Sequence, residues 1–187
     1  MLAVLRPDLK IQQVSIVGRE HTQGHLAVTA EDGPQRQATA NSRLKDMAVA
    51  LGGREAERLR YPDTGPCEGG AHDLYKARTI AFMSVAHRGL DEGPDGFASF
   101  TVLNADDEDR SLWPEQMKQH LWQRVRVWMQ RAQDLAHQTL RNHWPALQQI
   151  TQELLANDYL PGDRILAIVA GHQRQPGGPA LTSHLES

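Results

Sequence analysis

The stretch between Met117 and Thr139 constrains the fold of this chain more than any other. Its mostly apolar positions recur every three or four residues, at Met117, Leu121, Val125, Trp128, Ala132, Leu135 and Thr139. This spacing predicts one face of a long α-helix, roughly 40 Å in length at 1.5 Å per residue. Pro114, followed by Glu115, is typical of the first positions of such a helix. All four tryptophans lie in or near this stretch of the sequence and indicate a packed core or a helix-helix contact. They are Trp113, Trp122, Trp128 and Trp144.

Composition excludes several classes of function. The 187 residues carry 20 basic and 23 acidic side chains, a net charge of -3, so no strong positive field favours nucleic acid or an anionic membrane as a partner. The single cysteine, Cys67, has no disulfide partner within the chain, which favours a reducing, cytoplasmic compartment. No apolar run approaches the length of about 18 residues typical of a membrane span, and the first residues lack the pattern of a signal peptide.

The first forty residues predict short elements. Residues 1–6 are helix formers and resemble the end of a helix. Alternation and β-branched residues over 11–29 predict a β-hairpin. The polar stretch 30–40 is interpreted as a loop that ends at the helix-capping candidates Asn41 and Ser42.

Further helices are predicted on both sides of the long one. Apolar residues at helical spacing predict them over 44–59, 73–87, 145–155 and 163–169. Gly52 and Gly53 interrupt the first of these helices, and we expect close packing as the reason, because a glycine costs about 1 kcal/mol in a helix interior. Residues 89–109 are interpreted as a long connection, with room for one short strand. The predicted fold class is therefore mainly α with a small β-hairpin near the N-terminus, and we expect a domain over 1–170 followed by a disordered tail over 171–187.

Two glycine-containing motifs lie in the predicted helices. The segment Ala50–Glu57 (Ala-Leu-Gly-Gly-Arg-Glu-Ala-Glu) is similar to the leucine-glycine-glycine-arginine-x-alanine-glutamate helix of the FtsH-type ATP-dependent zinc metalloproteases. The segment Gly69–Ala77 (Gly-Gly-Ala-His-Asp-Leu-Tyr-Lys-Ala) is similar to that family's glycine-alanine-x-asparagine-aspartate-leucine-x-x-alanine segment. Residues 137–168 resemble the family's ending, with a leucine-x-glycine break before a final short helix. The resemblance to the peptidase domain covers about residues 1–170, and the three motifs agree in order and spacing.

The resemblance implies an FtsH-like peptidase fold, proteolysis of polypeptides and a zinc cofactor. By the second motif, Asp73 stands where the family has its third zinc ligand. The other interpretation of Asp73 needs no metal, because a carboxylate near the start of a helix is stabilised by the helix dipole. No Walker A motif occurs in the 187 residues, so we expect no ATP site in them, and an unfolding motor would be another polypeptide.

The family's other two zinc ligands come from a helix bearing histidine-glutamate-x-x-histidine, whose glutamate deprotonates the zinc-bound water. The candidate in this chain runs from His21 to His25 and has Thr22 at the position of the glutamate, which cannot act as a general base near neutral pH. In an extended strand four residues also span about 13 Å, too far for one metal. We therefore interpret His21 and His25 as exposed hairpin histidines, with a metal-binding role as the less favoured alternative. The remaining histidines show no paired metal spacing and are interpreted as solvated or capping groups; they are His72, His87, His120, His137, His143, His172 and His184.

The register of the first motif places the family's zinc helix at the start of this chain. When Gly52 and Gly53 are aligned with the family helix, residues 14–17 fall in the hairpin that follows the zinc helix, which would then end around Met1 to Leu5. The chain would hold the third ligand without the first two, through a truncated or misassigned start or because it is a pseudopeptidase. We expect an incomplete or degenerate metal site with no catalytic residue. The alternative function is a non-catalytic helical domain for protein-protein interaction or self-association.

Overall fold

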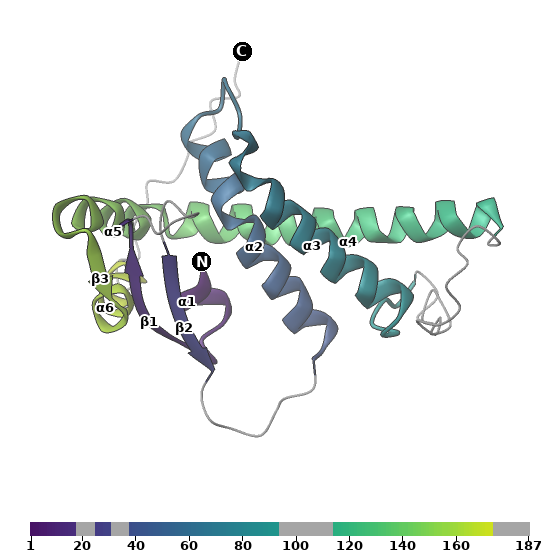
Figure 1. Cartoon of the computed structure of the whole chain (residues 1–187), viewed down its shortest axis with the longest axis horizontal. Helices are drawn as coiled ribbons and strands as arrows, with labels where there is room; N and C mark the ends of the chain where they lie inside the picture. Colours follow the sequence, from purple (N-terminus) through teal and green to yellow (C-terminus); the bar gives the residue numbers. More distant parts are fainter. Residues whose placement is uncertain (18–24, 31–37, 94–113, 174–187) are drawn as a thin grey trace, which may run out of the picture. The chain divides into compact units, whose positions relative to one another are not determined.

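The computed structural model describes residues 1–17, 25–30, 38–93 and 114–173 (Figure 1). Its elements, in chain order, are α1 (Leu2–Leu5), β1 (Leu9–Ser15), β2 (His25–Ala30), α2 (Ala40–Arg60), the short 3-10 helix η1 (Glu68–Gly70), α3 (Ala71–Ala86), α4 (Glu115–Asn142), α5 (Trp144–Asn157), β3 (Tyr159–Pro161) and α6 (Gly162–Gln173). The mainly α fold with strands near the N-terminus is therefore confirmed. Most of the predicted connection 89–109, Trp113 and residues 174–187 of the predicted tail lie outside the described residues. The first three residues of that tail, 171–173, which the sequence predicts to be disordered, form the last positions of α6.

The chain divides into two compact units. Unit 1 comprises Met1–Lys10 and Ala30–Asn142, and unit 2 comprises Ile11–Thr29 and His143–Ser187. Each unit buries apolar residues of its own. Among the described helices, none combines the length and the apolar character that crossing a membrane requires.

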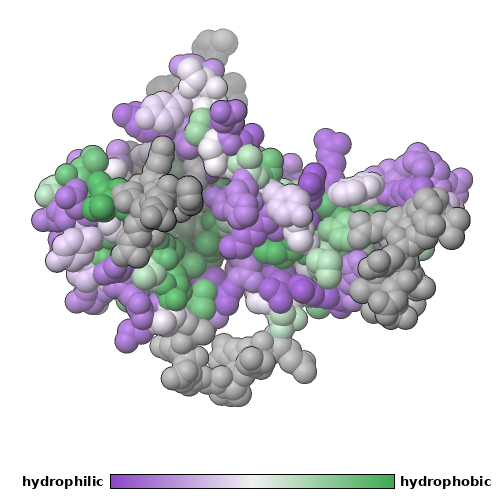
Figure 2. Space-filling model, in the orientation of Figure 1, coloured by the Kyte–Doolittle hydropathy of each residue, from purple (hydrophilic) through white to green (hydrophobic). Residues whose placement is uncertain are grey.

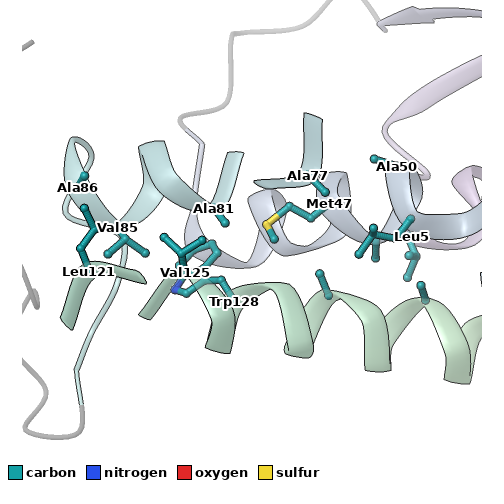
Figure 3. Packing of buried hydrophobic residues seen from close by; sticks show 14 residues of the cluster. Leu5, Met47, Ala50, Ala77, Ala81, Val85, Ala86, Leu121, Val125 and Trp128 are labelled. Carbon is teal, nitrogen blue, oxygen red and sulfur yellow. The ribbon is translucent and has the colours of Figure 1, made fainter. Parts of the chain in front are cut away.

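Unit 1 is built on three helices. Helix α2 packs against α3 and α4, and α3 also packs against α4. Its core combines small and large side chains, as Figure 3 shows; the members with almost no exposed surface are Met47, Ala48, Ala77, Ala81, Val85, Ala86, Trp128, Ala132 and Ala136. Alanines at successive turns of α3 and α4 let the helix axes approach closely, while Trp128 and Met47 fill the space between them.

Trp128 is the tryptophan that confirms the expectation of a packed core. It is 2% exposed, whereas Trp122 on the same helix is 51% exposed. Trp128 Nε1 donates a hydrogen bond of 2.7 Å to the buried carboxylate of Asp91. Arg124 donates two further bonds of 2.8 Å to that carboxylate, one from Nε and one from Nη2, and this pairing raises the pKa of Arg124. The segment that follows α3 is thereby tied to α4 by a buried charge whose hydrogen bonds are satisfied.

The beginning of α2 differs slightly from the sequence prediction. Thr39, rather than Asn41 or Ser42, is the N-cap residue, and its side chain accepts a hydrogen bond from the backbone N–H of Ser42. The Ser42 hydroxyl lies 2.9 Å from the backbone nitrogen of Thr39, which completes a reciprocal capping box. The helix therefore starts a turn earlier than the apolar pattern indicates.

The expected reason for Gly52 and Gly53 is wrong. A Cβ atom at Gly52 would lie 3.5 Å from the side chain of Met1, which is an ordinary contact distance. A Cβ at Gly53 would meet no atom within 4 Å. Close packing therefore does not require glycine at either position of α2.

Unit 2 contains a three-stranded sheet in the order β2-β1-β3. Strand β3 is antiparallel to β1, with Val14 opposite Leu160, and it forms where the sequence predicts only a break between helices. Helix α5 is followed by its C-cap residue Asp158, which adopts a left-handed conformation with a φ of 62°. Gly162 then allows the chain to pass β1, because a Cβ atom there would lie 1.7 Å from the carbonyl oxygen of Ile11.

Candidate functional site

The two glycine motifs meet within unit 1. The first lies on α2 and the second spans η1 and the start of α3. A Cβ atom at Gly70 would lie 3.7 Å from Cβ of Arg54, so the end of η1 is close to the side of α2. The two motifs, which follow one another in the sequence, therefore also lie close together in the fold.

Glu57, the last residue of the first motif, holds the turn between the two motifs. Its Oε2 accepts a hydrogen bond of 2.8 Å from the backbone N–H of Cys67, and its Oε1 lies 3.3 Å from the Cys67 sulfur. Cys67 precedes η1 directly and is exposed. Because η1 leads without a gap into α3, this carboxylate restrains the chain just before Asp73.

Asp73 occupies the first turn of α3, three residues after the N-cap Gly70. Its side chain is exposed, as is that of the neighbouring His72. A carboxylate at this position interacts favourably with the unpaired N–H groups of the helix start, in agreement with the interpretation that needs no metal. An exposed carboxylate in the second motif is equally compatible with a ligand position.

The described side chains do not assemble a metal site. Among them, no group of three or more histidine, cysteine, aspartate or glutamate residues lies close enough to hold an ion. His21 lies outside the described residues, and of His25 only the backbone, at the start of β2, is described. Zinc requires three protein ligands or more, so the described residues do not fit it. We therefore assign no step of peptide hydrolysis to them.

A buried carboxylate on α2 escaped the sequence analysis. Glu55 is 2% exposed, and its Oε1 lies 3.2 Å from Nη1 of Arg58 on the same helix. Its Oε2 lies 3.6 Å from Nδ1 of His137 on α4 and has no hydrogen-bond partner among the described residues. His137 is therefore more than a solvated group, because it faces a buried negative charge. The signal in the sequence is the position of Glu55 four residues after Leu51, on the buried face of α2.

Comparison with known proteins gives the class of this fold. A model of the family described as "Peptidase family M41" matches residues 1–168, and the chain belongs to this family. The match spans both glycine motifs and extends into α6, so it agrees with the resemblance stated from the sequence.

Three relatives of known description are longer than this chain. It is 26% identical over 181 residues to the ATP-dependent zinc metalloprotease FtsH of Metamycoplasma arthritidis, which covers 95% of this chain and 24% of the relative. It is 27% identical over 179 residues to the ATP-dependent zinc metalloprotease FtsH 1 of Thermomicrobium roseum, covering 92% of this chain and 27% of the relative. A third relative, the ATP-dependent zinc metalloprotease FtsH 1 of Rhodopirellula baltica, is 34% identical over 119 residues, which covers 61% of this chain and 17% of the relative. The chain thus spans about a quarter of the length of the first two relatives.

Proposed function

We propose that this chain is a peptidase-domain scaffold that serves the proteolysis of polypeptides, and that its zinc site is incomplete or degenerate. The observation that carries the proposal is the position of Asp73. It stands in the second family motif at the start of α3, yet no group of potential ligands large enough to hold a metal is found among the described residues. On this proposal Asp73 stands at a third-ligand position, and the described residues do not complete the ligand set.

The membership in the peptidase family supports the proteolytic part of this proposal. The relatives are named zinc metalloproteases. In such sites a bound zinc ion activates a water molecule for attack on a peptide bond. The dependence on ATP, which their names also state, is not part of the proposal for these 187 residues.

Zinc content tests the proposal. The chain is loaded with zinc chloride and desalted, and bound zinc is measured by mass spectrometry together with cleavage of denatured casein. We expect far less than one zinc per chain and no cleavage above background, because one carboxylate binds zinc weakly. Asp73→Asn is compared with Asp63→Asn, which removes an exposed carboxylate from the turn after α2.

One zinc per chain that is lost in Asp73→Asn and retained in Asp63→Asn contradicts the incomplete site. If His21→Ala and His25→Ala also release that zinc, the early histidines are ligands, and the interpretation of them as exposed hairpin residues is wrong.

A second candidate function is a non-catalytic domain that associates with itself. Unit 2 supports it, because three of its large apolar side chains are more than half exposed: Leu155 at 72%, Tyr159 at 59% and Val17 at 54%. Figure 2 shows hydrophobic residues at the surface on the left of the view, where Figure 1 labels α5. Exposed apolar surface of this kind is typical of interaction sites.

Light scattering tests self-association. We expect a mass that rises with protein concentration, and a lower mass for Leu155→Glu, because a charge on the apolar surface opposes its burial. The control is Leu74→Glu, which changes a half-exposed residue of unit 1. Leu2→Glu would not serve as a control, because α1 contributes to a core. A strictly monomeric chain at all concentrations excludes this function.

A further inference from the structure

Arginine side chains converge at one end of unit 1, away from both glycine motifs. Arg6, which follows α1, donates from Nε and Nη2 to the carboxylate of Asp8, at 2.9 and 2.8 Å. Its Nη1 donates to Oδ1 of Asp46 on α2. Arg43, in the first turn of α2, approaches the same carboxylate, with Nη1 3.4 Å from Oδ2 of Asp46. Asp46 is therefore shared by two guanidinium groups.

Arg43 is poorly paired for a side chain that is only 28% exposed. Its Nε is buried without a hydrogen-bond partner, and its Nη2 has no partner among the described residues. Burial lowers the pKa of Arg43, and the positive charges of Arg88 and Arg6 lower the pKa further. The negative charge supplied by Asp46 is thus insufficient for the cations around it.

Arg88 brings a third positive charge to this place. It follows the C-cap residue of α3, is exposed, and forms no ion pair with the residues that the structure describes. Figure 1 shows that α3 ends at the same end of the helix pair at which α2 begins. The cluster of Arg6, Arg43, Arg88, Asp8 and Asp46 therefore has one net positive charge.

We propose that Arg43 and Arg88 form a binding site for the carboxylate of a polypeptide, either an acidic side chain or a chain end. One carboxylate carries the single negative charge that the cluster lacks. Its two oxygens match the paired N–H groups that a guanidinium presents, and such charge-assisted bonds are stronger than neutral ones. Asp8 and Asp46 hold Arg6 and one side of Arg43 in place, which leaves Nη2 of Arg43 and the guanidinium of Arg88 for the ligand.

The test uses N-acetyl-glutamate amide as the probe and its glutamine analogue as the neutral match. Both are titrated into the full chain labelled with ¹⁵N at constant ionic strength, and the Nε–Hε signals of the arginines are followed. We expect saturable shifts for Arg43 and Arg88 with the glutamate compound alone. Acetate is titrated separately, to distinguish a free small carboxylate from the polypeptide source.

Variants separate this site from a general effect of charge. Arg88→Gln is expected to weaken binding about tenfold, the loss of one charge-assisted hydrogen bond, while the chain stays folded because Arg88 is exposed. Arg78→Gln is the matched control, since Arg78 is an exposed arginine of α3 that lies over the ring of Tyr75. Binding to Arg78→Gln should equal that of the unmodified chain.

Four results would overturn the proposal. They are the absence of a saturable shift, equal binding of the glutamine analogue, undiminished binding in Arg88→Gln, and an equal loss in Arg78→Gln. Binding of acetate without binding of the glutamate compound would remove the polypeptide as the source. None of these measurements depends on zinc or on cleavage, so the carboxylate site and the proposed peptidase function can fail separately.

Discussion

Gly53 lies on the exposed side of α2, where no neighbouring atom would restrict a side chain. Glycine is unfavourable in a helix because it loses more backbone freedom on folding than other residues. Its presence at this position therefore lowers the stability of α2 without a packing gain in unit 1. Gly162 shows the opposite relation, since the backbone of β1 occupies the space that any Cβ would need.

We expect Gly53→Ala to raise the free energy of unfolding by about 1 kcal/mol, the difference in helix propensity. Urea denaturation followed by circular dichroism measures the change. In Gly52→Ala the new methyl group would contact Met1 at 3.5 Å, so the gain should be similar or smaller. A loss of stability in Gly53→Ala would show that α2 needs glycine for a reason absent from this fold.

Gly162→Ala should destabilise unit 2 by about 3 kcal/mol or more, because the methyl group would overlap the carbonyl oxygen of Ile11 and force β1 and α6 apart. Gly171→Ala in the same helix is the control, since a Cβ there meets nothing within 4 Å. Thermal unfolding of the two variants should therefore differ strongly. Equal melting temperatures would contradict the close approach of these backbones.

At the scale of elements, α5 and α6 are joined by an exposed ion pair. Arg164 donates from Nε and Nη2 to the two carboxylate oxygens of Glu153, at 2.8 and 2.6 Å. These bonds, with a further one from Gln149, lower the pKa of Glu153 to about 2. The two helices therefore share a charge pair whose strength depends on pH.

The sign of this dependence follows from the lowered pKa. In the unfolded chain Glu153 has the ordinary glutamate pKa of about 4.3. In the folded chain its pKa is about 2, so the carboxylate stays charged to a lower pH. The pair therefore stabilises fully above this window and progressively less as the pH falls through it. We expect urea unfolding between pH 6 and pH 3 to show a shallower loss of stability in Glu153→Gln than in the unmodified chain. Parallel curves would mean that solvent screens the pair completely.

The link between the segment after α3 and α4 depends on Asp91. We expect Asp91→Ala to reduce the stability of unit 1 by about 3 kcal/mol, because Arg124 keeps a charge with no buried partner and Trp128 Nε1 loses its acceptor. Guanidinium denaturation followed by circular dichroism measures the loss. Glu92→Ala is the control, since Arg124 contacts only the backbone carbonyl of Glu92. A similar effect of both substitutions would assign the loss to the segment rather than to the carboxylate.

At the scale of the whole molecule, the chain has two cores. The buried cluster around Trp128 and Met47 belongs to unit 1. Leu154, Leu160, Ile165 and Ile168 are buried in unit 2. Because each unit has its own apolar core, damage to one should be measurable separately from the other.

Amide hydrogen exchange of Gly162→Ala tests this independence. We expect the amides of β1 and α6 to exchange faster, while those in the middle of α2 and α4 keep their protection. Loss of protection in both units to the same degree would show that the chain unfolds as one cooperative unit.

The candidate site was only partly accessible from the sequence. The positions of the motifs and of Asp73 at a helix start follow from local spacing, and the fold has them where expected. The pairing of Glu55 with His137 does not, because the two residues are far apart in the chain and meet only when α4 packs on α2. The same holds for the arginine cluster, in which Arg6 and Asp46 are forty positions apart.

The amino-acid sequence alone determined the long helix, the fold class and the family, because helical periodicity and short motifs are properties of neighbouring residues. Tertiary structure decided which glycine is indispensable, where a third strand forms and which charges are buried. Strand β3 has three residues and exists through its hydrogen bonds to β1, and Gly162 is required by the backbone of a strand some 150 positions earlier. Such features depend on contacts between distant segments, for which a local pattern of side chains carries no signal.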